Sequence, residues 1–315
     1  MPNNDLPIYA TQLPRLTTAD GVQLREDVLF TSEKGEPDER RKKRALEALS
    51  SLREILPNLL EKDETVLYVV KTCQAPMGSL EQFLLGWNAY RVSATRLVFT
   101  NLRLLHFGME SDKKWRRTVK AVRWGDITEA KVKGWLNRKL QLRYANGMKE
   151  SYWRLQRKDS LKIKAILDAV IPQSRGQATP AQGFQSICPD CRAVLTAGKY
   201  ECTSCGLRFK DEKTLLTRTL LIPGGGYMYA SMTLLGVLNF FTEGLFTVAA
   251  IFWILMMVGI IAPERDADGR VMQSGETLTV ALFFLLLVGS HKALEYVHGR
   301  RAIRTFLPWK KRGET

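Results

Sequence analysis

Three long stretches without a charged residue lie close together in the C-terminal third of this 315-residue chain. They cover residues 219–241, 245–262 and 277–290. A helix needs about 20 mostly apolar residues to cross the hydrocarbon core of a bilayer. Three such stretches in succession are not typical of the core helices of a soluble protein. We therefore expect a membrane region over residues 215–298, in which only a few helices cross.

Two CxxC pairs precede this region, and their four thiols are the strongest chemical signal in the chain. The predicted ligands are Cys188, Cys191, Cys202 and Cys205. Four thiolates at this spacing form the tetrahedral set that Zn²⁺ prefers, and with no position left open the single ion would be structural. A module as small as residues 187–210 cannot bury a sizeable core and would need the ion to fold.

The alternative for these cysteines is disulfide or redox chemistry. A redox motif needs one CxxC pair rather than two. The fifth cysteine, Cys73, lies far away in a strand-like stretch, and an odd number of thiols suits a reducing compartment better than a disulfide framework. The segment is similar to a short zinc ribbon. Arg192 departs from that pattern, because the first turn of such ribbons often has glycine there, as Gly206 follows the second pair.

Charge and thiol chemistry together predict the membrane topology. The tail, residues 299–315, is basic and should stay cytoplasmic, and the thiols must stay reduced. Two cytoplasmic flanks require an even number of crossings. We expect residues 245–262 and 277–297 to span a bacterial inner membrane and residues 219–241 to be re-entrant or interfacial, since they begin with Pro223-Gly-Gly-Gly. Three crossings are the alternative.

Positive charge is concentrated in one soluble segment. Residues 65–175 carry 22 basic and 8 acidic residues, which accounts for +14 of the net charge of +15. Such a surface attracts acidic lipid or nucleic acid, or it serves solubility alone. The densest candidate patch comprises Lys113, Lys114, Arg116, Arg117, Lys120 and Arg123. A second basic run, Arg40–Arg44, is either a phosphate-binding patch or a solvated helix face.

The first 59 residues begin with a polar segment that we expect to be loosely attached through residue 36. No basic start followed by an apolar stretch precedes it, so a secretory signal is not expected. An amphipathic helix is predicted over residues 38–56, because leucines and Ile55 recur on one face before Pro57.

Between residues 64 and 155 the apolar residues alternate, which predicts a series of β-strands. Turn residues separate them, and Ala145-Asn-Gly147 is typical of a tight hairpin. One amphipathic helix follows over residues 158–170. A small antiparallel sheet closed by a C-terminal helix is the simplest assembly. A flexible linker is expected over residues 173–186, which are rich in Gly, Pro, Gln and Ser.

This order resembles a bacterial PH-like domain over residues 60–172. The resemblance is carried by Asp63-Glu-Thr-Val-Leu-Tyr68, by the strand–turn–strand segment Ala94–His106 and by Val122-Arg-Trp-Gly-Asp-Ile127. It implies an α+β antiparallel sheet or barrel with a C-terminal helix. The expected fold is thus multi-domain, with this domain, the zinc ribbon and α-helical transmembrane segments. The opening of the membrane region, Ile222–Tyr229, is similar to small bacterial two-helix membrane modules.

Two polar features near the membrane stretches have two readings each. Glu243, between two apolar runs, is a functional intramembrane carboxylate or an interfacial turn residue. His291, Glu295 and His298 share one helix face and form a metal or proton site or an ordinary helix end.

No nucleophile–base pair, phosphate-binding glycine motif or metalloprotease motif is present, so an enzyme is not expected. These parts predict a membrane-anchored adaptor or scaffold that binds a protein partner or acidic lipid headgroups. One alternative is a membrane-tethered nucleic-acid binder that stacks bases on Trp115, Trp124, Trp135 and Trp153. The other is a small transporter or ion-conducting subunit built on Glu243, which would act as a homo-oligomer.

Overall fold

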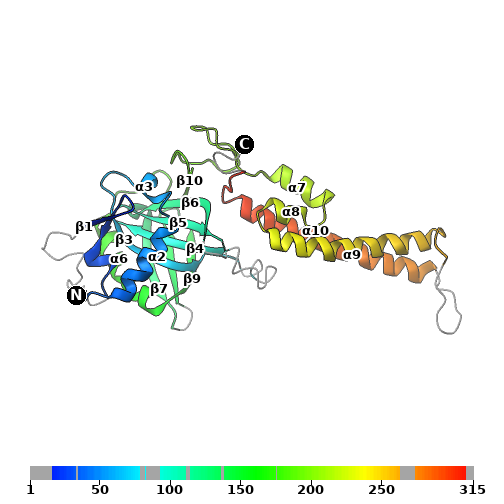
Figure 1. The fold of residues 1–315 in the computed structure, drawn as a ribbon, viewed down its shortest axis with the longest axis horizontal. Coiled ribbons are helices and arrows are strands. Elements are labelled where there is room, and N and C mark those ends of the chain that lie inside the picture. The colour runs from blue at the N-terminus through cyan, green and yellow to red at the C-terminus, as the bar shows by residue number, and fades with distance from the viewer. Residues whose placement is uncertain are drawn as a thin grey trace. The chain divides into compact units, whose positions relative to one another are not determined.

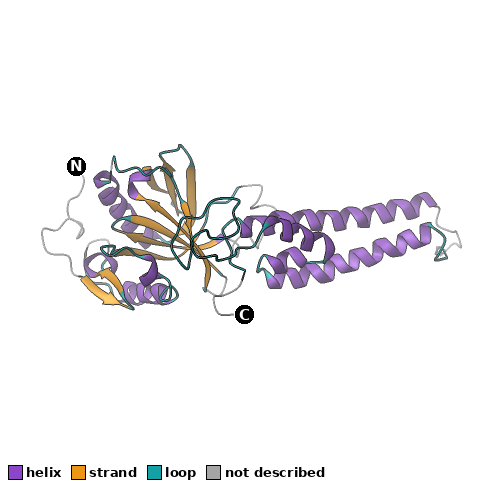
Figure 2. Cartoon of the chain, turned by 90° about the horizontal axis from the view of Figure 1, so that it is seen from above, coloured by secondary structure: helices purple, strands orange, loops and turns teal. Residues whose placement is uncertain are grey.

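A computed structural model describes residues 16–32, 35–78, 82, 93–110, 114–135, 138–174, 176–262 and 274–309. The chain divides into two compact units, Met1–Leu207 (unit 1) and Arg208–Thr315 (unit 2). Unit 1 is built on an antiparallel sheet, and unit 2 is α-helical (Figures 1 and 2).

Unit 1 contains two antiparallel meanders that follow one another along the chain. The first pairs β3 to β6 in sequence order, and the second pairs β7 to β9. The pairing of Gln74 with Trp153 joins β3 to β9, and helix α6 follows at once. The bounds are β3 (Val66–Gln74), β4 (Ala94–Thr100), β5 (Arg103–Met109), β6 (Trp115–Arg123), β7 (Ile127–Lys133), β8 (Arg138–Tyr144), β9 (Lys149–Leu155) and α6 (Arg157–Gln173).

Most of the predicted strands and turns are confirmed. The hairpin between β8 and β9 is closed by Asn146-Gly147, where Gly147 has φ +82° and its N–H donates to Tyr144 O. The short 3₁₀-helix η2 (Trp124–Asp126) separates the meanders where the sequence predicts a turn. The strand expected over residues 83–87 lies outside the described residues.

The core of unit 1 lies between the sheet and its helices. Leu97, Val98 and Phe99 of β4 are fully buried, and Trp124 stacks on Phe99 with ring centroids 6.1 Å apart. Helix α6 adds Ile163 and most of its predicted apolar face, although Leu161 is exposed. Strand β4, which is buried from Thr95 to Thr100, is thus covered on both sides.

The N-terminal segment differs from the expected loose polar stretch. It forms the hairpin β1 (Leu16–Ala19) and β2 (Val22–Arg25) and the short helix α1 (Glu26–Leu29). Val22, Leu24, Val28 and Leu29 are all buried in the core, and this run is too short to show a helical period in the sequence. The helix expected over residues 38–56 is divided into α2 (Glu39–Ser50), a turn and α3 (Leu56–Leu59).

The expected linker is also structured in part. Thr179 N and Oγ1 donate to the two carboxylate oxygens of buried Asp126 at 2.6 and 2.7 Å. Phe184 packs edge-on against Tyr144 and His106. Strand β10 (Gln185–Ile187) then pairs with β6. Because these contacts are made by isolated polar and aromatic residues, composition alone indicated a flexible segment.

Unit 2 consists of two short helices, α7 (Glu212–Leu221) and α8 (Gly225–Tyr229), and two long ones. The long helices are α9 (Thr233–Met257) and α10 (Ser274–Ile303), which lie side by side (Figures 1 and 2). In the described part of the chain, Thr233–Met257 and Gly275–Ile303 are long and apolar enough to cross a membrane.

The boundaries of these helices correct the sequence prediction. The stretch 219–241 does not form one element, because Pro223 and Gly224 separate α7 from α8, and α9 begins at residue 233. Gly224 has φ +66°, a conformation that favours glycine. Helix α9 then continues through Glu243, although the sequence predicted an interruption between residues 241 and 245. The helix can continue because that carboxylate is buried and hydrogen-bonded. The first long helix therefore starts twelve residues before the predicted position 245.

The end of the chain folds back within unit 2. Phe209 forms a β-bridge with Pro308, and its ring packs edge-on against Phe306 at 5.5 Å. Lys210 N donates to Leu307 O at 2.9 Å. Residues 306–309 of the predicted tail are thus folded, whereas residues 310–315 lie outside the described part.

Candidate functional site

The four candidate cysteines lie in two backbone turns that share one hydrogen-bond pattern. In the first turn, Arg192 N donates to Cys188 O at 3.0 Å. In the second, Gly206 N donates to Cys202 O at 2.9 Å. Arg192 and Gly206 have φ values of +66° and +72°, so the same left-handed position closes both turns. The arginine that departs from the ribbon pattern adopts the conformation that glycine normally supplies there.

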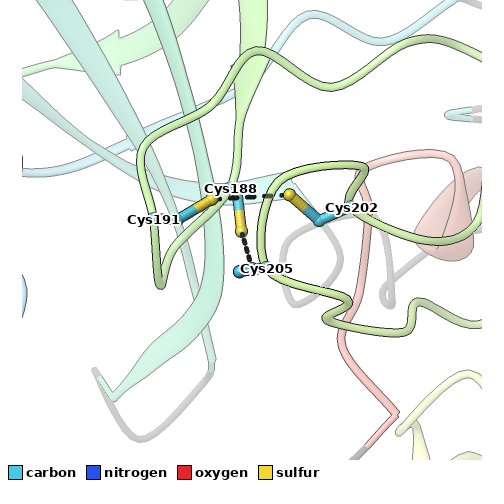
Figure 3. A group of neighbouring side chains, drawn as sticks. All are labelled: Cys188, Cys191, Cys202 and Cys205. Carbon is cyan, nitrogen blue, oxygen red and sulfur yellow. Dashed lines mark hydrogen bonds between the residues drawn. The ribbon is translucent and has the colours of Figure 1, made fainter.

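The sulfur atoms converge between these turns. All four Sγ atoms lie within 4.8 Å of one another, and Cys188 Sγ lies 3.6 Å from Cys205 Sγ while Cys191 Sγ lies 3.4 Å from Cys202 Sγ (Figure 3). None of them forms a disulfide. A tetrahedron with metal–sulfur bonds of about 2.3 Å has edges of about 3.8 Å. The four cysteines could therefore hold one metal ion.

The backbone around the sulfurs favours thiolates. Burial alone would raise the pKa of the Cys202 thiol. Hydrogen bonds, first among them those from the backbone N–H groups of Ser204 and Cys205, together have the larger, opposite effect, and they lower the pKa to about 7. At Cys188 burial is the larger effect and raises the pKa of the thiol, while hydrogen bonds from the N–H groups of Cys191 and Asp190 oppose it. These donors stabilise negative charge on sulfur, which is the form that binds metals. The donor set thus fits a thiophilic ion with no vacant coordination position.

The metal candidate is attached to the sheet of unit 1 rather than separated from it. Strand β10, which leads into Cys188, pairs with β6 through Gln185–Ile187. Arg117 of β6 also forms an ion pair with Asp190, at 3.0 Å between Nη2 and Oδ1. Since Asp190 lies between the first two cysteines, the ribbon and the sheet edge are held together by backbone and side-chain contacts.

The predicted basic patch is divided among separate structural contacts. Arg116 donates to Met109 O, Arg117 pairs with Asp190, and Arg123 pairs with Glu61 at 2.5 Å. Lys114 is exposed and Lys120 is half-buried, whereas Lys113 lies outside the described residues. The alternation of β6 sends neighbouring side chains to opposite faces. Three of the six residues are thus engaged in contacts within unit 1, and their role as a binding patch stays a prediction.

A different basic surface is concave and was only partly indicated by the sequence. Arg40, Arg41 and Arg44, from the run already noted as a phosphate-binding candidate, line a hollow with Lys71 and Lys158. The latter two come from β3 and α6, which are distant in the sequence. Only the fold could show that they meet the arginines.

In unit 2, the structure places Glu243 inside the helix pair. Its side chain is 1 % exposed, and Lys292 Nζ lies 2.5 Å from Oε1. Asn239 Nδ2 and Gly224 N donate to Oε2, and Asn239 Oδ1 lies 2.7 Å from His291 Nδ1. The carboxylate therefore joins α9, α10 and the turn before α8, and it is not a solvent-exposed turn residue.

A second buried carboxylate, Glu295, holds the short helix α8. Its Oε1 accepts from Gly226 N at 2.5 Å and from Tyr227 N at 3.0 Å. The Tyr227 hydroxyl lies 2.7 Å from His298 Nδ1. The predicted face of His291, Glu295 and His298 thus points at α8 and α9, and its groups join helices to one another.

The comparisons with known proteins give no family for the chain. The sequence matches no protein-family model, and it matches no curated protein sequence. The function is therefore argued from the geometry above.

Proposed function

We propose that this protein is a membrane-anchored adaptor of a bacterial inner membrane. Its PH-like domain, with the ribbon that follows, binds a protein partner or acidic lipid headgroups at the cytoplasmic face. Helices α9 and α10 form the anchor, with a short loop outside and both ends of the chain in the cytoplasm. The chain performs no catalysis in this proposal.

One observation carries the adaptor proposal. The ribbon is hydrogen-bonded to the sheet edge and ion-paired to it through Arg117 and Asp190, so the soluble part offers one continuous binding body. The same chain continues into two long apolar helices. The order of four strands, three strands and a helix supports the PH-like identity. A body of this kind fits a binding role at a membrane.

The metal in this proposal is one structural Zn²⁺ held by Cys188, Cys191, Cys202 and Cys205. Four sulfur donors at these separations suit Zn²⁺, and the ion would tie two turns that share little apolar surface. Reduced thiols are in keeping with a cytoplasmic location for unit 1.

The test is purification of the tagged full-length chain from native membranes, with partner, lipid and zinc content measured on one sample. We expect one zinc per chain and a protein or acidic lipid recovered at a fixed ratio. The variant Cys202→Ser/Cys205→Ser should lose the zinc, whereas Cys73→Ser, at a buried thiol outside the ribbon, should keep it. Recovery of the chain with neither a protein nor enriched acidic lipid would contradict the adaptor proposal.

Topology is tested separately with reporter fusions. A fluorescent protein fused after Thr315 should fold and fluoresce, and alkaline phosphatase inserted between residues 262 and 274 should be active outside. An inactive insertion together with a fluorescent C-terminus would contradict the two-crossing arrangement.

The nucleic-acid alternative retains one specific observation. Trp153 is exposed, and Lys139 Nζ lies 4.4 Å from the centroid of its ring; Trp135 is 82 % exposed. The other tryptophans weighed for stacking are less accessible, since Trp124 is buried and Trp115 donates to Thr118 O. A gel shift with single-stranded nucleic acid over a range of salt separates the two functions. A steep salt slope that Trp135→Ala/Trp153→Ala abolishes would favour nucleic acid.

A further inference from the structure

We propose that unit 1 binds a phosphate group in a hollow where α2, β3 and α6 meet. The proposal rests on the adaptor function and gives it a ligand chemistry. The hollow has a volume of about 380 Å³, which lies in the range of small-ligand sites. It differs from the basic patch on β6 that the sequence indicated, because it is concave and its cations come from three elements.

Five basic residues line the hollow, and their arrangement follows from the fold. Helix α2 contributes Arg40, Arg41 and Arg44. Arg44 lies four positions after Arg40 and three after Arg41, so it is a neighbour of each on the helix surface. Lys71 comes from β3 and Lys158 from the first turn of α6. The fold therefore gathers cations from positions more than a hundred residues apart.

Two carboxylates also line the hollow, and both are engaged in holding its walls. Asp38 caps α2 by accepting from Arg41 N at 3.0 Å, and its Oδ2 lies 3.7 Å from Arg41 Nε. Asp159 accepts from the Tyr68 hydroxyl at 2.8 Å. Five cations against these two anions leave an excess of three positive charges in the lining.

Three of the five basic residues in the lining are available to a ligand. Lys71 is engaged with Glu47 at 2.7 Å. Arg40, Arg44 and Lys158 are exposed, and within the described part of the chain their side chains form no hydrogen bond or ion pair. Nothing else in the described part neutralises these three groups by direct contact.

Phosphate fits this lining better than a carboxylate does. A phosphate group carries up to two negative charges and three terminal oxygens, so it can accept from Arg40, Arg44 and Lys158 together, whereas a carboxylate offers one charge and two oxygens. Helix α6 also begins at the hollow, and Gln156 at its start provides no side-chain cap. The backbone N–H groups of that first turn add partial positive charge. The phosphate can belong to a lipid headgroup or to a soluble molecule.

The experiment measures protection of Lys158 from an amine-reactive label by mass spectrometry, on the full-length protein. The soluble arm uses detergent-solubilised protein with pyrophosphate. The lipid arm compares nanodiscs of phosphatidylcholine with nanodiscs that also contain phosphatidic acid. Lys149, which is exposed and lies outside the hollow, is the internal control. We expect labelling of Lys158 to fall at least fivefold in one arm, while Lys149 changes less than twofold.

The arm that shows protection identifies the source of the phosphate. Arg40→Glu/Arg44→Glu should abolish the protection, and Arg53→Glu, an exposed basic position after α2, should preserve it. Equal labelling of Lys158 in all conditions, or protection that survives in Arg40→Glu/Arg44→Glu, overturns the proposal. If a protein partner is still recovered from membranes in that case, the hollow is refuted and the adaptor function stands.

Discussion

The two units place apolar and polar groups in opposite ways. Unit 1 buries residues such as Phe99 and Leu104 completely. Unit 2 exposes Phe241 and Leu286, each 68 % accessible, and buries Glu243 and Glu295 at 1 % or less. An apolar exterior around hydrogen-bonded charges is the arrangement that a hydrocarbon solvent favours. The difference is what we expect if, as proposed, unit 1 folds in water and the long helices of unit 2 lie in a membrane.

Both units nevertheless treat a buried charge alike. In unit 1, Glu64 accepts bonds from Arg103 Nε and Nη2 and from the Thr100 hydroxyl. In unit 2, Glu243 accepts from Asn239 and Gly224 and pairs with Lys292. A buried carboxylate without such partners would be costly in either solvent. Both carboxylates are thus partnered, although Glu295 Oε2 and His298 Nε2 in unit 2 are buried without a hydrogen-bond partner among the described residues. The apolar surface is what differs between the units.

The largest effect is expected in the ribbon, which follows neither arrangement. Among residues 188–205, all of which are described, Leu195 is the one large aliphatic side chain that is buried. Structural Cys₄ sites contribute about 10–16 kcal/mol of apparent metal-binding free energy at neutral pH. We expect Cys202→Ser or a strong chelator to disorder this segment and to leave the sheet and the helices folded.

Limited proteolysis and metal analysis measure this loss. Cleavage should appear between residues 188 and 205 and nowhere else in unit 1, and Cys73→Ser should retain one metal ion per chain. A ribbon that resists protease after complete metal removal would show that packing alone holds it.

Truncation of a phenylalanine to alanine should cost much more stability in unit 1 than in unit 2. Phe99→Ala removes a fully buried ring that stacks on Trp124, so the free energy of unfolding of unit 1 should fall by about 4 kcal/mol. Phe241→Ala removes an exposed ring, and unit 2 in detergent should change by less than about 0.5 kcal/mol. Trp124 fluorescence during denaturation reports the first, and a titration with a denaturing detergent reports the second.

Comparable losses at both positions would contradict the contrast between the units. Phe99→Leu provides the matched control, because it keeps most of the buried volume. Its cost should be well below that of Phe99→Ala.

Truncation of either buried carboxylate should lower the free energy of unfolding by a similar amount in the two units, and by less than Phe99→Ala does. Glu243→Ala leaves Lys292 without its ion-pair partner, and Glu64→Ala leaves Arg103 with only the more distant Glu61, 3.8 Å from its Nη1. Each should cost about 3 kcal/mol. The double variant Glu243→Gln/Lys292→Met removes both charges and should recover a substantial part of that loss. Unfolding titrations of the full-length chain in detergent measure all four proteins.

The single variant Glu243→Gln distinguishes the structural role from transport. If Glu243→Gln lowers the stability of unit 2, and the wild-type chain shows no ion flux in proteoliposomes, the carboxylate has a structural role. Ion flux in the wild-type chain that Glu243→Gln abolishes would instead support the conducting alternative.

What the sequence allowed us to predict depended on whether a signal is local or long-range. The CxxC pairs, the Asn-Gly hairpin and helix α6 are each encoded within a few neighbouring residues, and the structure has them. The apolar stretches likewise predicted two long helices, although the break was expected at Glu243. That carboxylate looked like a boundary because its partners, Lys292 and Gly224, are distant in the sequence.

The parts that escaped prediction all depend on distant partners. Thr179 binds Asp126, and Phe184 enters an aromatic cluster, so a segment with linker composition is docked on the sheet. The basic hollow joins Arg40 to Lys158 across the fold. The composition of a segment describes neighbouring residues and does not indicate which distant side chain each residue contacts in the fold.

The smallest expected effect concerns the backbone of the two ribbon turns. Arg192 and Gly206 occupy the same left-handed position, but only glycine adopts it without steric cost. Gly206→Ala should therefore weaken the ribbon by about 1 kcal/mol, a roughly fivefold loss of metal affinity. Arg192→Gly should strengthen it by about 0.5 kcal/mol, because relief of strain exceeds the entropy that glycine adds to the unfolded chain.

Competition with a metal indicator of known affinity measures both changes. Arg192→Ala serves as the control, since it removes the charged side chain and keeps the Cβ that causes the strain. If Arg192→Ala and Arg192→Gly bind metal equally well, the side chain and not the backbone conformation limits the first turn. A gain confined to Arg192→Gly would mean that the ribbon, unlike the rest of unit 1 and unlike unit 2, is limited by turn geometry rather than by what it buries.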